Sequence, residues 1–218
     1  MNKTNTLVAL FDFDGVIMDT EGQYTIFWDE QGRKYLAIEK FGKLIKGQTL
    51  GQIYEKYFAG MEDVQHQIRV DLDLYEQNMS YQYIPGLVTF LDDLRRHGVK
   101  MAIVTSSNQK KMQNVYRVHP DLQSHFDKII TADLFNHSKP DPECFLLGMQ
   151  LFDALPKNTF VFEDSFHGLA AGIASGARVV ALATTNSHDE VVDKAHMVID
   201  DFEEMTFEKL LKVNCIAE

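Results

Sequence analysis

The stretch "LVALFDFDGVIMDT", residues 7–20, joins an apolar run to a cluster of acidic side chains. The apolar run ends at Phe11, and Asp12, Asp14 and Asp19 follow within eight residues. An apolar run without alternation is typical of a strand that is covered on both faces of a sheet. The aspartates that follow it are therefore expected at the edge of that sheet, where an ion or a ligand can balance their charge.

Further apolar runs of the same kind recur along the chain, separated by segments with helical spacing. The helical spacing is clearest at Leu87, Phe90, Leu91 and Leu94, which follow one face of a 3.6-residue period. Strands that alternate with helices predict a parallel sheet with right-handed crossovers. The predicted fold class is α/β with a Rossmann-like parallel sheet as its core. The expected strands are residues 7–11, 100–105, 128–131, 159–163 and 178–184.

One long segment interrupts this alternation. Residues 20–83 contain no strand pattern, but they carry apolar stripes at helical spacing, and Pro85-Gly86 marks the return to the alternating pattern. We therefore predict a helical cap domain at residues 20–83, inserted into a core domain that comprises residues 1–19 and 84–218.

Composition and charge restrict the classes of partner. The chain has 218 residues, of which 45% are hydrophobic and 24% charged, and its formal net charge is −11. Such a charge gives no long-range attraction to nucleic acid or to anionic membranes, so neither is expected as a partner. The two cysteines stand alone, and the polar N-terminal residues do not resemble a signal peptide. We expect a cytoplasmic monomer that acts on a small molecule.

Polar side chains follow each of the first four predicted strands. Ligands of open parallel sheets bind at the carboxyl ends of the strands, so these side chains are expected to meet in one crevice. Taken singly, each has a simpler structural interpretation, such as a helix cap, a helix N-terminal acidic pair or a solvated loop lysine. Their occurrence at four strand ends favours a common site. They are Asp12 and Asp14, then Thr105, Ser106 and Ser107, then Lys139, and finally Glu163 and Asp164.

The chemistry of this set favours phosphoryl transfer. Carboxylates that would repel one another can share a hard cation such as Mg²⁺, which also accepts a phosphate oxygen. A metal ion, an ammonium group and backbone amides together can neutralise a phosphate monoester while an aspartate attacks phosphorus. The expected substrate is therefore a small phosphorylated metabolite.

Four short motifs, in this order along the chain, carry a resemblance to a known family. "DFDGV", "VTSS", "SKPDPE" and "FEDS" resemble the four motifs of the haloacid dehalogenase superfamily, and the resemblance covers essentially the whole chain. With a helical cap inserted after the first motif, the chain is most similar to the β-phosphoglucomutase-like sugar phosphatases. Because the leaving oxygen of a phosphate ester needs a proton and a halide does not, the second aspartate of "DFDG" favours phosphate chemistry over dehalogenation.

The resemblance implies a role for each motif residue. It makes Asp12 the nucleophile and a metal ligand, and Asp14 the general acid and then base, with its backbone carbonyl on the metal. It implies that Thr105 and the amide of Ser106 hold the phosphoryl group and that Lys139 neutralises it. For Mg²⁺, the resemblance further implies that Asp164 is a direct ligand and that Glu163 lies close to the metal.

The resemblance leaves three functions open. The first is a Mg²⁺-dependent phosphatase of a sugar phosphate that works through an aspartyl-phosphate, the second a hexose-phosphate mutase, and the third a non-catalytic phosphate- or metal-sensing module. A mutase needs a cap cation for a second phosphate, and the related mutases place an arginine shortly after a Lys-Gly pair. Here Leu50 stands in that position after Lys46 and Gly47, which favours the phosphatase. Lys43, Lys46 or Arg69 could replace the arginine, and Lys46 is the candidate phosphate contact.

Overall fold

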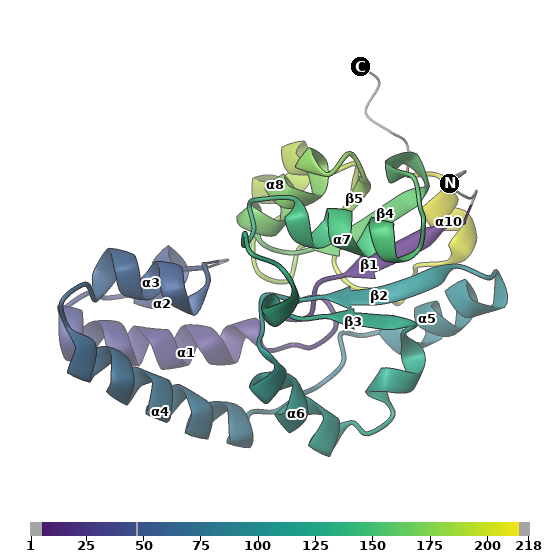
Figure 1. The fold of residues 1–218 in the computed structure, drawn as a ribbon. Helices are drawn as coiled ribbons and strands as arrows, with labels where there is room; N and C mark the ends of the chain where they lie inside the picture. The colour runs from purple at the N-terminus through teal and green to yellow at the C-terminus, as the bar shows by residue number, and fades with distance from the viewer. Residues whose placement is uncertain (1–5, 47, 214–218) are drawn as a thin grey trace.

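The core is one parallel sheet of six strands. The computed structural model describes residues 6–46 and 48–213. Within them the strand order is β3-β2-β1-β4-β5-β6, all neighbours pair in parallel, and helices cover both faces (Figure 1). The predicted α/β fold class is confirmed, while the last edge strand was not predicted. The strands are β1 (Val8–Phe11), β2 (Lys100–Val104), β3 (Lys128–Ile130), β4 (Thr159–Glu163), β5 (Arg178–Leu182) and β6 (Met197–Ile199).

Successive residues of the central strands point into two separate hydrophobic layers. In β1, Ala9 and Phe11 belong to one buried cluster, whereas Val8 and Leu10 belong to the other. This division explains why the strand sequence is apolar throughout rather than alternating. The first layer lies under α5 (Leu87–Arg96) and α10 (Phe207–Leu211), and the second under α7 (Glu143–Leu151) and α8 (Phe166–Ala174).

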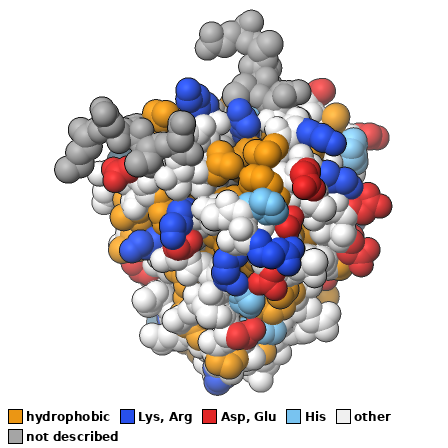
Figure 2. All heavy atoms as spheres, turned by 90° about the vertical axis from the view of Figure 1, so that its right-hand side faces the viewer, with side chains coloured by type: hydrophobic (Ala, Val, Ile, Leu, Met, Phe, Trp, Pro, Cys, Tyr) orange, Lys and Arg blue, Asp and Glu red, His pale blue; other side chains and the backbone are white. Residues whose placement is uncertain are grey.

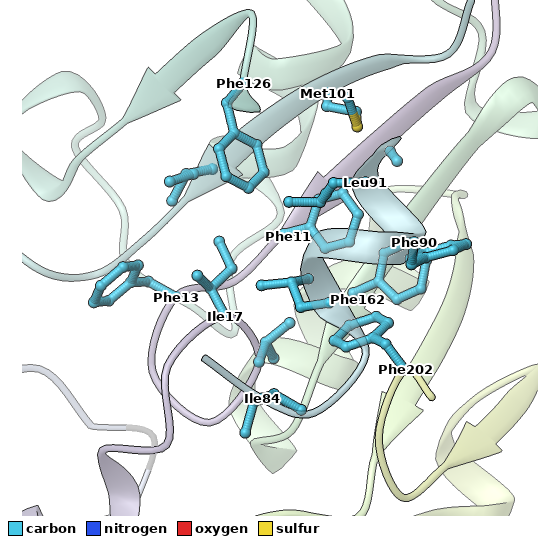
Figure 3. Close-up of a cluster of buried hydrophobic side chains, with 14 of the residues drawn as sticks. Phe11, Phe13, Ile17, Ile84, Phe90, Leu91, Met101, Phe126, Phe162 and Phe202 are labelled. Carbon is cyan, nitrogen blue, oxygen red and sulfur yellow. The ribbon is translucent and has the colours of Figure 1, made fainter. Parts of the chain in front are cut away.

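Aromatic rings fill the first layer below the strand ends. Phe11 of β1 stacks on Phe162 of β4 with ring centroids 4.4 Å apart, and Phe90 of α5 stacks on Phe202 at 5.5 Å (Figure 3). Offset and edge contacts between such rings add to the free energy that their burial already contributes. The ends of β1 and β4 are therefore fixed side by side, directly where the acidic motifs begin.

Helices between β1 and α5 form a lobe beside the sheet, on the left of Figure 1, which we call the cap. It has its own aromatic core, in which Trp28, Phe41 and Phe58 are buried. Thr49 starts one of its helices with a capping box shared with Gln52. The cap helices are α1 (Glu21–Gln31), α2 (Phe41–Leu44), α3 (Leu50–Tyr57) and α4 (Glu62–Asn78), with a π-helical turn at Gly32–Leu36.

The two segments that connect the cap to the core run side by side. The backbone N–H of Asp19 donates to the carbonyl of Gln82 at 2.8 Å, and that of Ile84 donates to Ile17 at 3.0 Å. The returning segment then turns at Gly86, which has a φ of 77°. A Cβ at this position would lie 2.3 Å from the backbone nitrogen of Glu203, so only glycine fits.

A second contact joins the cap to the core through α4 and α6 (Gln109–Val118). Lys110 forms an ion pair with Asp73, and the guanidinium of Arg117 donates to the carbonyl of Gln77 at 3.0 Å. The cap therefore rests on a core helix that begins just after β2.

The outer face of the core, away from the cap, carries both signs of charge. Figure 2 shows acidic and basic side chains interspersed on this face around a small central group of hydrophobic ones. None of the helices in the described part of the chain has the length and apolar character that crossing a bilayer requires.

Candidate active site

The polar residues at the strand ends line one crevice between the core and the cap, with a volume of about 210 Å³. Its lining includes cap residues as well, among them Lys46 and Leu50. The convergence predicted from four separate strand ends is therefore present in the structure. The predicted site residues that line the crevice are Asp12, Asp14, Thr105, Ser106, Lys139, Glu163, Asp164 and Lys46.

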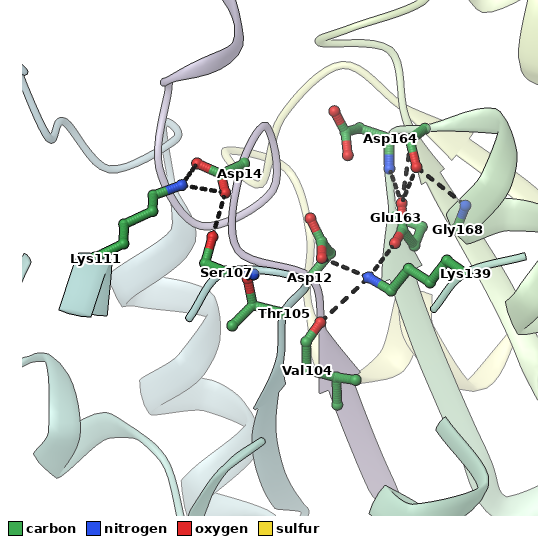
Figure 4. A network of polar contacts seen from close by, with 11 residues as sticks. Asp12, Asp14, Val104, Thr105, Ser107, Lys111, Lys139, Glu163, Asp164 and Gly168 are labelled. Carbon is green, nitrogen blue, oxygen red and sulfur yellow. Dashed lines mark hydrogen bonds and ion pairs between the residues drawn. The ribbon is translucent and has the colours of Figure 1, made fainter. Parts of the chain in front are cut away.

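Lys139 occupies the centre of the buried part of the site. It comes from the loop before α7, and its Nζ donates to Asp12 Oδ1 at 2.5 Å, to Glu163 Oε1 at 2.6 Å and to the carbonyl of Val104 at 3.3 Å (Figure 4). Burial acts to lower the pKa of Lys139, but the two carboxylates outweigh burial and raise it above its ordinary range. The ammonium group therefore stays charged and links the ends of β1, β2 and β4.

Asp12, Glu163 and Asp164 form a buried cluster of carboxylates. One oxygen from each lies within 4.8 Å of the others. Burial raises the pKa of Asp12 to about 7, against the opposing charge of Lys139 and together with the like charge of Glu163. Burial and the charges of Glu21, Glu163 and Asp12 also raise the pKa of Asp164 well above its ordinary value.

The donor set of this cluster fits a hard divalent cation. One ammonium group cannot balance three buried carboxylates, and oxygen ligands at this spacing suit Mg²⁺. The side chain of Asp14 is not part of the cluster.

Local backbone contacts orient Glu163. Its Oε2 accepts hydrogen bonds from the backbone N–H groups of Asp164 at 3.0 Å and Ser165 at 3.1 Å, while Ser165 caps α8 by accepting from the N–H of Gly168. A Cβ at Gly168 would lie 1.9 Å from the carboxyl carbon of Glu163. The sequence "FEDSFHG" thus combines a helix cap with a glycine that makes room for the carboxylate.

The carboxylate of Asp14 faces α6 rather than Lys139 (Figure 4). It accepts hydrogen bonds from Thr20 Oγ1 at 2.5 Å and from Ser107 Oγ at 3.0 Å, and Lys111 Nζ contacts both of its oxygens. Three donor groups therefore hold this carboxylate in one orientation through four contacts.

Lys111 is a member of the site that the sequence analysis missed. It is buried, although lysine rarely is, and its ammonium lies 4.5 Å from the centre of the Tyr24 ring. The sequence contained a signal for the burial of Lys111, because this residue stands four residues before Val115 and therefore on the same, inward face of α6. That helix is capped by Asn108, whose side chain accepts from the N–H of Lys111, so the residues Thr105 to Ser107 are not the cap.

The cap contributes charged and aromatic groups to the crevice. Lys46 Nζ donates to the carbonyl of Thr185 at 3.1 Å and lies 3.9 Å from the carboxylate of Glu21. The hydroxyl of Tyr24 donates to Glu76 Oε1 at 2.9 Å, and burial raises the pKa of Glu76. None of these cap groups except Lys46 was a predicted site residue.

Comparison with known proteins identifies the family. Residues 9–182 match the sequence profile of the haloacid dehalogenase-like hydrolases. The chain belongs to this family. The match spans both acidic motifs, the hydroxyl motif and the lysine motif, so the resemblance drawn from those four motifs is confirmed.

Relatives and solved structures agree with this membership. The chain is 25% identical over 210 residues to hexitol phosphatase A of Escherichia coli, covering 92% of this chain and 93% of that protein. It is 26% identical over 213 residues to a bifunctional riboflavin kinase/FMN phosphatase of Arabidopsis thaliana, covering 92% of this chain but only 55% of that protein. Its fold matches a family IA hydrolase structure from Entamoeba histolytica with a TM-score of 0.83 and 23% identity, over 95% of this chain and 99% of the other.

Proposed function

We propose that this hydrolase is a Mg²⁺-dependent phosphatase that releases phosphate from a small phosphorylated metabolite of the sugar phosphate class. The observation that carries the proposal is the position of Asp12, whose carboxylate contacts the Lys139 ammonium and belongs to one cluster with the carboxylates of Glu163 and Asp164. This arrangement offers a nucleophile, a fixed positive charge and a metal site within one crevice. The phosphatase names of the relatives support the same class of reaction.

The proposed metal ligands are Asp12, Asp164, the backbone carbonyl of Asp14 and, close by, Glu163. When bound, Mg²⁺ would withdraw negative charge from the phosphate oxygens, which is the chemistry that buried carboxylates alone cannot supply. The proposed phosphate contacts are the hydroxyl of Thr105, the backbone N–H of Ser106 and the ammonium of Lys139. Thr105 is buried at the end of β2, which suits a fixed contact.

In the first half-reaction, Asp12 attacks phosphorus and the bond from phosphorus to the leaving oxygen breaks. Asp14 donates a proton to that oxygen, so the products are an alcohol and an aspartyl-phosphate on Asp12. In the second half-reaction, Asp14 removes a proton from water as the water oxygen attacks phosphorus. Inorganic phosphate leaves, and Asp12 is regenerated as a carboxylate.

The proposed domains are a core comprising residues 1–19 and 84–218 and a cap at residues 20–83, with substrate bound between them. The separate aromatic core of the cap supports this division. The cytoplasmic location and the monomeric state expected from the sequence stay predictions.

Phosphate release from p-nitrophenyl phosphate and acetyl phosphate tests the proposal. Turnover should require Mg²⁺ and should stop in EDTA, which separates an enzyme from a sensing module. Interconversion of glucose 1-phosphate and glucose 6-phosphate, with a hexose bisphosphate primer, should be followed beside phosphate release. Isomerisation that outran hydrolysis by a large factor would replace the phosphatase with the mutase, in spite of Leu50 in the crevice lining.

A further inference from the structure

The part of the crevice that comes from the cap and α6 has two ammonium groups. Each of them already contacts polar groups of the protein itself. Lys111 contacts both oxygens of Asp14 and lies over the rings of Tyr24 and Phe13, at 4.5 and 5.5 Å from their centres. Lys46 is held by the carbonyl of Thr185 and by the nearby carboxylate of Glu21.

Lys139 is occupied in the same way by Asp12 and Glu163. These three lysines are the cations of the crevice lining within the described residues. No lining cation there is left over for a second anionic group of a substrate.

Carboxylates outnumber ammonium groups in the same part of the crevice. The two ammonium groups of Lys46 and Lys111 share the crevice with the cap carboxylates of Glu21 and Glu76 and with the carboxylate of Asp14, from the loop after β1. Within the described residues, Glu76 has no lysine or arginine at ion-pair distance. Its only described side-chain hydrogen bond comes from the Tyr24 hydroxyl, and its side chain is buried on the inward face of α4.

These contacts favour one kind of leaving group. Hydroxyl groups can donate to the carboxylates of Glu76 and Glu21, and Tyr24 and Trp28 belong to the same lining. A carboxylate or a second phosphate would instead be buried beside like charge without a free partner.

We propose that the crevice selects monophosphates whose leaving group is uncharged and rich in hydroxyls, and that Glu76 is a residue that rejects substrates with a second anionic group. The proposal rests on the proposed phosphatase function and specifies its substrate class. It also argues against a hexose bisphosphate as a bound species, since the second phosphate would face the same carboxylates.

Two matched substrate pairs test the proposal with the unmodified protein. In 3-phosphoglycerate a carboxylate replaces the terminal CH2OH group of glycerol 3-phosphate, and the same replacement relates 6-phosphogluconate to sorbitol 6-phosphate. With Mg²⁺ present, kcat/KM measured by phosphate release should favour the uncharged member of each pair by about 10-fold or more. Equal values, or a preference for the anionic members, would overturn the proposal.

Glu76→Gln removes the charge but keeps an oxygen that accepts from Tyr24. In each pair, the ratio of kcat/KM for the uncharged member to kcat/KM for the anionic member should fall by about 3- to 10-fold. Glu55→Gln, which removes an exposed carboxylate of the cap outside the crevice, is the matched control and should leave the preference unchanged. Equal effects of the two variants would reject a special role of Glu76, and thermal melting of both checks that they fold.

Turnover of p-nitrophenyl phosphate separates this proposal from the function on which it rests. If the protein hydrolyses p-nitrophenyl phosphate but prefers 3-phosphoglycerate to glycerol 3-phosphate, only the inferred substrate class is wrong. If none of these esters is hydrolysed with Mg²⁺, the phosphatase function itself fails, and the substrate class fails with it.

Discussion

The two walls of the crevice are built in different ways. On the core wall, buried side chains come from strand ends whose spacing the sheet fixes, and Lys139 ties β1, β2 and β4 together. On the cap wall, the side chains come from helices that pack around their own aromatic cluster and meet the core domain through polar contacts and through Tyr24 and Tyr75. We expect the core wall to set the reaction and the cap wall to set the substrate, so that substitutions in the two walls should have separable effects.

The largest effect is expected at the core wall, from Asp12→Asn. The amide cannot attack phosphorus, so kcat should fall by at least ~10⁴-fold with every substrate. The fold should persist, because Lys139 keeps its contact with Glu163. Asp19→Asn, at an exposed carboxylate seven residues along, is the control and should retain activity. Near-normal kcat of the Asp12 variant would exclude the aspartyl-phosphate route.

The next effect is expected from Asp14→Asn, which removes the proposed acid and base. General acid–base assistance contributes ~10²–10⁴-fold, and kcat for alkyl phosphates should fall within that range. The nitrophenolate leaves without a proton, so with p-nitrophenyl phosphate only the second half-reaction should slow and a burst of nitrophenol should appear. If the Asp14 variant lost only substrate affinity and kept its kcat, the proposed acid and base role of Asp14 would be contradicted.

The metal site gives a prediction of intermediate size. Asp164→Asn replaces an anionic oxygen with a weaker neutral one and should raise the Mg²⁺ concentration for half-maximal activity by about 10-fold or more. Ca²⁺ should compete with Mg²⁺ yet support little turnover. Its looser coordination would not keep the attacking oxygen of Asp12, the phosphorus and the leaving oxygen in line. Activity that survives EDTA and exhaustive dialysis would rule out the metal.

The sequence predicted the core wall better than the cap wall for a physical reason. A parallel sheet brings all its carboxyl strand ends to one edge, so residues as far apart as Asp12 and Lys139 can be grouped from the strand pattern alone. The edge strand β6 was not predicted, whereas β3, at the other edge of the sheet and also of three residues, was.

A helical stripe, in contrast, shows which face of a helix is buried but not what covers it. The pattern placed Tyr24 and Trp28 in a helical cap, but it did not place Glu76 near the crevice. Lys111 was missed because its partner Asp14 is 97 residues away along the chain, and a lysine next to Lys110 resembles part of a solvated face.

The smallest effect concerns the loop that carries Lys139. Glu143, in the first turn of α7, accepts hydrogen bonds from the backbone N–H groups of Asn136 at 3.0 Å and His137 at 2.7 Å. These bonds and the His137 side chain lower the pKa of Glu143 to about 2, from an ordinary value of 4.5. Because the pKa is depressed in the folded state, the stabilisation is complete above about pH 4.5 and is lost as the pH falls towards 2.

Glu143→Gln should therefore be less stable than the unmodified protein at pH 7, and the difference between their urea midpoints should shrink between pH 4.5 and pH 2. The difference isolates Glu143, because the other carboxylates titrate alike in both proteins. For Glu55→Gln, at an exposed cap carboxylate, the difference from the urea midpoint of the unmodified protein should not shrink over this pH range. Since the loop bears Lys139, kcat of Glu143→Gln at pH 7 should fall slightly, while the preference between glycerol 3-phosphate and 3-phosphoglycerate should not change. A changed preference would mean that the core wall also sets the substrate, and the division of labour between the two walls would be wrong.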